Sequence, residues 1–103
     1  MKRLHLKCEN YWLITKNDND NSYWSGAWYF KLESAKSLIG GHIYFHNRKS
    51  EPSYFGGQVM NARQILYEGK NRVEFKFKKL ESCKGVAWEG DNTQRTWHSG
   101  FLT

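Results

Sequence analysis

The sequence predicts a small α+β fold that is mostly β, with a mixed or antiparallel sheet curled into a barrel. Three observations carry this prediction. Aromatic residues, which fit a pleated and half-buried surface, make up 17% of the 103 residues, with five Trp, six Tyr and six Phe. A single Pro leaves room for several strands. Residues 72–80 alternate strictly between two faces, which is typical of an antiparallel strand with one solvated side.

The first part of the chain is predicted to hold two aromatic strands and a helix. Residues 10–15 contain Tyr-Trp-Leu-Ile, and the Asn-, Asp- and Ser-rich residues 17–22 that follow favour a turn. Residues 23–32 form a second aromatic strand. Residues 33–39 are predicted as a short helix, with Ser34 as a capping residue and a Gly pair at its end.

The middle of the chain is predicted to hold the longest strands. Residues 42–46 alternate between apolar and polar side chains, which indicates a strand. Residues 47–55 are polar and basic and contain the only Pro, so we expect a surface loop. Residues 56–66 form a long strand that begins with two Gly, and a turn at 68–71 leads into the strand 72–80.

The tail from Gly85 onward is predicted to form two short strands around a turn at Asp91 and Asn92. The length allows one core, and no Pro-rich or Gly/Ser-rich linker divides the chain. Residues 1–103 are therefore predicted to form a single domain.

The charge balance favours an anionic partner. Sixteen Lys and Arg oppose ten Asp and Glu, which gives a net charge of +6. Such a balance favours nucleic acid first, with an acidic protein or an anionic membrane surface as alternatives, although an excess of cations can also serve solubility alone. No apolar run reaches the ~20 residues of a membrane helix. With no cationic and apolar leader, we expect a cytoplasmic protein in which Cys8 and Cys83 are free thiols.

No pattern typical of a metal site, a cofactor site or a catalytic site is present. His42 and His46 share a face of the predicted strand, but they lie about 13 Å apart by strand geometry, too far to chelate one ion. The sequence contains no Gly-x-Ser-x-Gly elbow, catalytic-cysteine signature or Gly-x-x-x-x-Gly-Lys phosphate loop. We therefore predict a protein without a cofactor or metal that is not an enzyme, with nucleic-acid modification as the weakest alternative.

The loop at 47–55 is a candidate binding segment. It carries two cations, Arg48 and Lys49, and the hydroxyls of Ser50 and Ser53, which can hold phosphate oxygens. Tyr54 offers a face on which a base can stack. The alternative is an ordinary solvated loop whose Tyr54 and Phe55 pack back on the barrel.

The tryptophans are candidates for a ligand pocket. Trp24 and Trp28 lie four residues apart around a Ser-Gly pair, and Trp88 and Trp97 each stand beside polar residues or Gly. About half of such rings are expected to be core anchors with bonded N–H groups. The others could stack on a base or a methylated cation.

The order of these segments resembles that of EVE domains in the PUA-like superfamily. The resemblance rests on Tyr-Trp-Leu-Ile at 11–14, the Trp-rich residues 24–28, the helix end at 38–41, Ile-Tyr-Phe-His at 43–46 and Gly-Gln-Val at 57–59. Two features depart from the family: Lys-Asn-Asp at 16–18 replaces its usual Lys-Ser-Glu-Pro, which occurs instead at 49–52, and the chain is shorter than a typical member.

The resemblance implies a small PUA-like β-barrel with one or two short helices that binds RNA or DNA. By position, Trp24 and Trp28 would line a pocket for a flipped or modified base, with His46 and Ser50 at its polar edge. Arg48 and Lys49 would contact phosphates. Ser53, Tyr54 and Trp97 are further candidate site residues, predicted from the composition and not from the resemblance. The alternative is a protein-binding module, such as a host-interaction or defence-related factor, whose exposed rings meet an acidic partner.

Overall fold

The computed structural model describes residues 2–17, 19–90 and 95–103, which form one six-stranded mixed sheet with one α-helix. The strand order is β1-β4-β5-β6-β3-β2, and only the pair β1–β4 is parallel. The mostly β prediction is therefore confirmed. The elements are β1 (Arg3–Lys7), η1 (Glu9–Tyr11), β2 (Ile14–Asn17), β3 (Ser22–Trp28), α1 (Leu32–Lys36), β4 (His42–His46), β5 (Phe55–Tyr67), β6 (Lys70–Lys79) and η2 (Glu81–Cys83).

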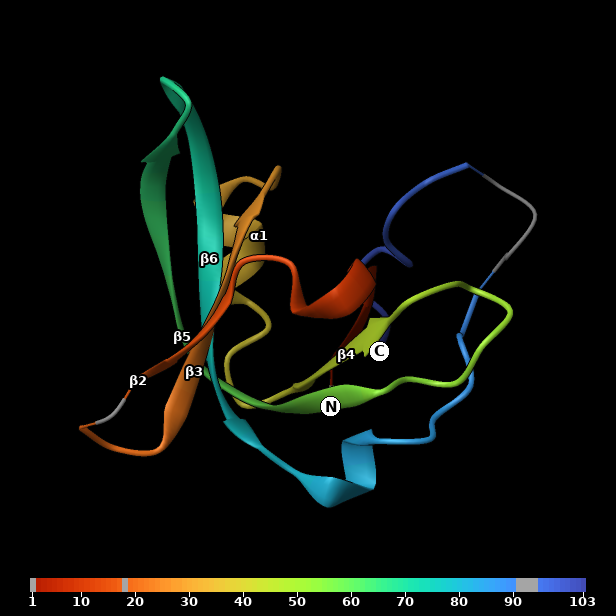
Figure 1. The fold of residues 1–103 in the computed structure, drawn as a ribbon. Coiled ribbons are helices and arrows are strands. Elements are labelled where there is room, and N and C mark those ends of the chain that lie inside the picture. The colour runs from red at the N-terminus through yellow and green to blue at the C-terminus, as the bar shows by residue number, and fades with distance from the viewer. Residues whose placement is uncertain (1, 18, 91–94) are drawn as a thin grey trace.

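The hairpin of β5 and β6 is the longest feature of the sheet and rises above it in Figure 1. Its two-residue turn, Glu68-Gly69, has φ angles of 51° and 76°, the left-handed backbone that tight hairpins need. Val73, Phe75 and Phe77 of β6 are buried, while the residues between them are partly exposed. The alternation predicted for this strand is thus confirmed.

The sheet is strongly curled. A flat sheet of six strands would place its edges about 24 Å apart. Only residues 8–13 separate the edge strands β1 and β2, and part of this segment is the compact turn η1. A chain this short spans such a distance only when it is almost fully extended. The sheet therefore bends around a core that includes Phe45, Phe75 and Phe77, and α1 packs against β5 and β6 (Figure 1).

Strand β1 was not predicted, although Leu4 and Leu6 alternate with Arg3, His5 and Lys7 along it. Leu4, His5 and Leu6 are all fully buried. On one side β1 pairs with β4, and on the other the C-terminal segment forms the isolated bridges Leu6–His98 and Arg3–Leu102. The alternation in β1 therefore does not separate a buried face from a solvated one, because the polar residue His5 is buried too.

Two predicted strand regions are wrong in detail. The strand at 10–15 is replaced by η1 and a turn in which Asn10, Tyr11 and Leu13 have φ angles of 51°, 60° and 51°, so that β2 begins only at Ile14. In the described part of the tail, isolated bridges take the place of two short strands, and the turn predicted at 91–92 lies outside the described residues. The strand predicted at 42–46 is present with those bounds, and the other predicted elements are present with shifted ends.

No helix among the described residues is long and apolar enough to cross a membrane.

Candidate functional site

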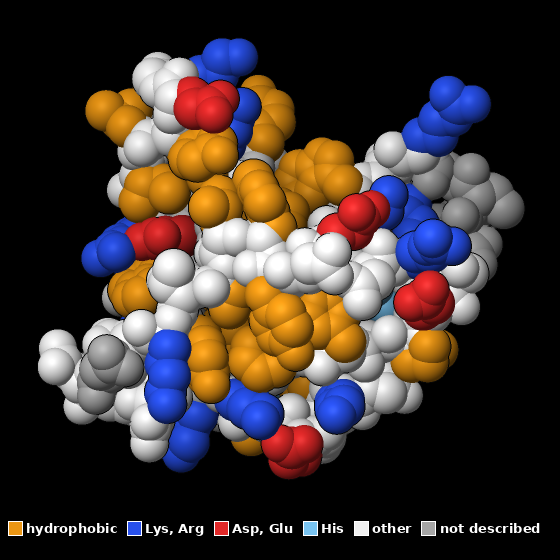
Figure 2. Space-filling view, viewed as in Figure 1, with side chains coloured by type: hydrophobic (Ala, Val, Ile, Leu, Met, Phe, Trp, Pro, Cys, Tyr) orange, Lys and Arg blue, Asp and Glu red, His pale blue; other side chains and the backbone are white. Residues whose placement is uncertain are grey.

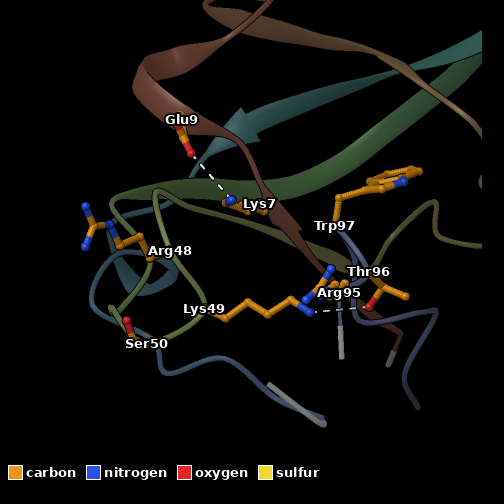
Figure 3. Close-up of a pocket in the computed structure, with 8 residues that line it drawn as sticks. All are labelled: Lys7, Glu9, Arg48, Lys49, Ser50, Arg95, Thr96 and Trp97. Atoms are coloured by element: carbon orange, nitrogen blue, oxygen red, sulfur yellow. Dashed lines mark hydrogen bonds and ion pairs between the residues drawn. The ribbon is translucent and has the colours of Figure 1, made fainter. Parts of the chain in front are cut away.

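A basic cleft of about 600 Å³ lies where three segments of the chain meet (Figure 3). The end of β1 and η1 supply Lys7 and Glu9, and the loop after β4 supplies residues 48–50. The C-terminal segment supplies residues 95–97. Four cations and one carboxylate line this cleft together with two hydroxyl groups and an indole: Lys7, Arg48, Lys49, Arg95, Glu9, Ser50, Thr96 and Trp97.

The parallel pair β1–β4 places two of these segments side by side. Lys7 is in register with His46, so both strands end at the same edge of the sheet and the chain that follows each one leaves from that edge. The backbone N–H of Cys8 donates to the carbonyl of His46 at 2.8 Å. The third segment joins because the N–H of Lys7 donates to the carbonyl of Trp97 at 2.8 Å. Backbone pairing thus fixes the cleft without the help of its side chains.

The cations of the cleft have loose ion pairs. Lys7 Nζ lies 3.5 Å from Glu9 Oε1, and Arg48 Nε lies 3.9 Å from a carboxylate oxygen of Glu51. Lys49 Nζ donates to the hydroxyl of Thr96 at 3.4 Å. In Figure 3 this bond runs beside Arg95, while Arg48 lies at the side opposite Trp97. The positive charges outnumber the negative one, so the cleft attracts anions.

An aromatic cleft of about 280 Å³ adjoins the basic one, because Trp97 lines both. Trp97 stacks on Trp28 with ring centroids 5.3 Å apart and an interplanar angle of 18°. Trp12 and Tyr29 are the exposed rings of this cleft, at 42% and 72%. A flat ligand could stack on either ring while an anionic group attached to it reaches the cations.

The backbone of the η1 region holds Trp12 outward. Three residues of this turn have the left-handed backbone described above, which is unusual for side chains of this size and is often found at functional sites. The hydroxyl of Tyr54 accepts a hydrogen bond from the N–H of Tyr11 at 3.1 Å and donates to the carbonyl of Cys8. Burial raises the pKa of Tyr54 well above its ordinary value. Tyr54 thus supports the turn from beneath.

The structure brings together four of the predicted site residues: Arg48, Lys49, Ser50 and Trp97 all line the basic cleft. Ser53 is buried, where its hydroxyl donates to the carbonyl of Cys83 at 2.6 Å and accepts from the N–H of Val86 at 3.0 Å. Ser53 therefore fastens the chain after η2 and does not line the cleft.

Trp24 and Trp28 do not share a pocket. Trp28 is buried, and its Nε1 donates to Ser25 Oγ at 2.9 Å. Trp24 lies instead against two cations of neighbouring strands, with Arg63 Cζ 3.9 Å and Lys76 Nζ 5.9 Å from its ring centroid. The bulge of β3 between Ser25 and Trp28 shifts the register, so spacing along the sequence does not place these two rings on one wall.

His46 is fully buried in a cluster that the sequence did not predict. His5 Nδ1 lies 2.8 Å from His46 Nε2, and His5 Nε2 lies 2.7 Å from Glu89 Oε2. Arg3 Nε donates to the same oxygen of Glu89 at 2.9 Å. Burial lowers the pKa of both histidines, and Arg3 is the main cause of a lowered pKa at Glu89.

Neither metal binding nor thiol chemistry has a visible basis in the described part of the chain. None of its His, Cys, Asp and Glu side chains form a group of three or more that could hold a metal ion. Cys8 and Cys83 are buried, and burial raises the pKa of Cys8 to about 11, which keeps that thiol protonated and unreactive.

The sequence did not mark Lys7, Arg95, Thr96 or Trp12 as site residues. Arg95 and Thr96 directly precede Trp97, and the presence of a cation and a hydroxyl beside an indole was a usable local signal. Lys7 had none, because its place depends on the pairing of β1 with β4.

No protein-family model, curated protein or solved structure significantly matches this chain. Its function has to be derived from the chemistry of the two adjoining clefts.

Proposed function

We propose that the protein is a non-catalytic nucleic-acid-binding module that holds phosphates in the basic cleft and a base in the aromatic cleft. The observation that carries this proposal is the cleft itself, which is lined by four cations, two hydroxyl groups and an indole but by one carboxylate alone. Cations and hydroxyls are the side chains that contact phosphate oxygens, and indoles are stacking platforms for bases.

The adjoining aromatic cleft favours single-stranded over double-stranded nucleic acid. Bases are free to leave the backbone and stack on aromatic side chains only where they are unpaired or flipped out. Trp12 and Tyr29 supply two exposed rings within the reach of a nucleotide whose phosphate lies near Trp97. A base in this cleft, modified or not, would meet the guanidinium of Arg72, which lies 5.0 Å from the ring of Tyr29.

A binding role fits the places of His5 and His46 better than a catalytic role does. His5 and His46 have no exposed surface, so a substrate in the cleft cannot reach them. Cys8 and Cys83, the two potential thiol nucleophiles, are buried as well. We also propose that the curled sheet is a minimal PUA-like barrel related to EVE domains, acting in the cytoplasm.

Titration of labelled oligonucleotides by fluorescence anisotropy tests the proposal. Single- and double-stranded DNA and RNA of one sequence are compared over a range of salt concentrations. Four phosphate contacts on a single strand predict a slope of log affinity against log salt of about −3. An excess of dextran sulfate, a polyanion without bases, should compete weakly if stacking adds to affinity.

A matched pair of variants separates the cleft from the overall charge. Arg95→Ala removes a cation of the cleft, and Lys36→Ala removes an exposed cation at the end of α1. We expect Arg95→Ala to weaken binding and to make the salt slope less steep by about one, while Lys36→Ala leaves both nearly unchanged. Equal effects of the two variants, or no binding at low salt, would overturn the proposal.

The exposure of Tyr11, Trp12 and Leu13 in one turn supports a second candidate, a module that binds an acidic protein. Three consecutive apolar side chains are 52%, 42% and 37% exposed. Figure 2 shows apolar side chains gathered on one face of the molecule, with both cationic and anionic side chains around them. Exposed aromatic residues are common anchors of protein interfaces. Failure of every oligonucleotide to bind would favour this candidate.

A further inference from the structure

The buried histidines form one continuous chain of hydrogen bonds. His46 Nδ1 lies 2.9 Å from the carbonyl oxygen of Glu51, and the two imidazoles face each other at 2.8 Å. His5 Nε2 then faces a carboxylate oxygen of Glu89 at 2.7 Å. The chain joins β4, β1 and the segment that carries Trp88 and Glu89.

The three contacts of this hydrogen-bond chain need three protons, which is one more than two neutral imidazoles carry. His46 Nδ1 must donate, since a carbonyl oxygen can only accept, and His5 Nε2 must donate for the same reason toward a carboxylate. The contact between the rings needs a third proton. Two neutral imidazoles supply two, so the pair must bear one positive charge to satisfy all three contacts.

The surroundings place the additional proton on the histidines and not on Glu89. Arg3 donates to both oxygens of Glu89 at 3.0 and 2.9 Å, which favours the ionised carboxylate. The Tyr44 ring stacks on His5 at 4.4 Å, and its hydroxyl lies 3.4 Å from His42 Nδ1. The titratable or charged side chains around the pair are thus Arg3, His42, Tyr44 and Glu89, with Lys49 beyond Trp88.

Trp88 links this cluster to the basic cleft. Its ring lies 5.6 Å from that of His5 and 5.0 Å from that of His46, and Lys49 Nζ lies 5.3 Å from its centroid. The indole N–H of Trp88 is buried and has no hydrogen-bond partner among the described residues. Trp88 is therefore held by ring contacts and by its neighbour Glu89, and it supports Lys49 in turn.

We infer that the His5–His46 pair is a proton-dependent latch: a single proton on the pair fastens Glu89 and Trp88, and this contact positions Lys49 for an anionic ligand. The regulatory part of this inference rests on the proposed function of the cleft. When the proton leaves, two protons remain for three contacts, so one contact has no hydrogen: that of His46 Nδ1 with the Glu51 carbonyl, that between the two rings, or that of His5 Nε2 with Glu89. One contact then becomes repulsive.

The sign of the effect follows from what each contact contributes. Burial, to which the sheet residue Tyr44 contributes, lowers the pKa of His5, and that part of the environment stays when Glu89 leaves. The hydrogen bond and charge of Glu89 act in the opposite direction and are present only in the fastened state. Trp88 adds to the burial and leaves with Glu89, but all three contacts are satisfied only when the pair holds the additional proton. Fastening therefore favours the protonated pair, and acidification favours fastening.

Nuclear magnetic resonance of the whole protein without a ligand tests the latch. We expect ring-to-ring Overhauser contacts of Trp88 with His5 and His46 at about pH 5.5, and clear weakening at about pH 8.5, on either side of the ordinary histidine pKa. Ring nitrogen shifts should show that the pair takes up one proton in this range. Equal contacts at both pH values would overturn the inference.

Glu89→Gln is the decisive variant, because an amide can donate to a neutral His5 Nε2. All contacts of the chain are then satisfied without an additional proton. We expect the Trp88 contacts to persist at both pH values in Glu89→Gln, while the control Glu81→Gln, which removes the partner of Lys79, keeps the pH dependence of the unsubstituted protein. A persistent pH dependence in Glu89→Gln, or loss of contacts at both values, would overturn the latch.

Oligothymidylate binding at constant ionic strength tests the regulatory part. We expect about fivefold tighter binding at the lower pH, a modest coupling between two sites. His98, next to Trp97, can also titrate. The decisive quantity is therefore how far Glu89→Gln reduces the ratio of the affinity at the lower pH to the affinity at the higher pH. An unchanged affinity ratio in Glu89→Gln would overturn the regulatory part of the inference. Absence of binding at either pH would refute the proposed function, while the ligand-free spectra would still decide the latch.

Discussion

Two regions of the molecule combine Trp with several cations, but in opposite ways. On the sheet, Arg63 lies 3.9 Å from the ring centroid of Trp24 and also pairs with Glu74. Lys76 Nζ lies 2.7 Å from Asp20, which is the main reason that the pKa of Asp20 falls to about 2. The ring and the cations of this sheet face bind one another.

In the basic cleft the same kinds of side chains surround an open space. The ion pairs of Lys7 and Arg48 are longer, at 3.5 and 3.9 Å, and Trp97 forms a wall beside them. The comparison teaches that a basic and aromatic composition does not identify a binding surface. The difference lies in whether local partners already occupy the charges and ring faces.

The largest expected effect is a loss of stability on substitution of Trp28, one of the two tryptophans that the sequence placed in one pocket. Trp28→Ala removes a buried ring and leaves its partner Ser25 unsatisfied, so it should lower the free energy of unfolding by about 3 to 5 kcal/mol. Trp24→Ala loses mainly a partly exposed cation–π contact, worth about 0.5 to 1 kcal/mol. Urea denaturation measures both, and similar losses would contradict the separate places of the two rings.

A second prediction compares the two sets of cations at equal net charge. The double substitution Arg48→Ala with Lys49→Ala should weaken oligonucleotide binding by on the order of a hundredfold and make the salt slope less steep by about two. Arg63→Ala with Lys76→Ala should change affinity little, because these cations already have close partners on the sheet. Anisotropy titrations give both quantities. Comparable losses would mean that affinity follows total charge and not the cleft.

A third prediction concerns the exposed ring of the aromatic cleft. Trp12→Ala should cost about 1 to 3 kcal/mol of binding free energy if a base stacks on this indole. Trp12→Tyr keeps an aromatic face and should recover much of the loss, which distinguishes stacking from a general effect on the turn. Trp24→Ala is the matched control and should bind normally. Full affinity in Trp12→Ala would place the base elsewhere.

The sequence predicted the parts of the fold that local patterns determine. The strand at His42–His46 and the hairpin of β5 and β6 have clear alternation and turn residues, and the structure contains them. Tyr-Trp-Leu-Ile has the composition of a strand, yet left-handed backbone angles at Asn10, Tyr11 and Leu13 make most of it a turn. Tertiary contacts, such as the bonds of Tyr54 to this turn, outweigh local propensity there.

The candidate site was half predictable for the same reason. Arg48, Lys49 and Ser50 form one loop, so composition alone marked them. The other wall depends on contacts between distant segments, such as the bond from Lys7 to Trp97. The histidine cluster is the extreme case, because His5 meets His46 across 41 positions and Glu89 across 84. No spacing rule along one chain indicates such a group.

The smallest expected effect is a loss of stability on mild acidification. Burial lowers the pKa of His5, His46 and His98, while the same residues in the unfolded chain titrate near the ordinary value of about 6.5. The unfolded state therefore binds more protons as the pH falls from about 6.5, so the free energy of unfolding should decrease over this range. Urea denaturation at several pH values measures this decrease.

Global stability and the latch should thus respond to acid in opposite directions. Protonation of buried histidines favours the unfolded chain over the folded one, yet within the folded state it favours the contact of His5 with Glu89. Glu89→Gln removes the carboxylate that helps His5 to hold its proton, so this variant should lose more stability on acidification while its Trp88 contacts stay independent of pH. A free energy of unfolding that is constant or rises as the pH falls below 6.5 would show that Glu89 outweighs burial.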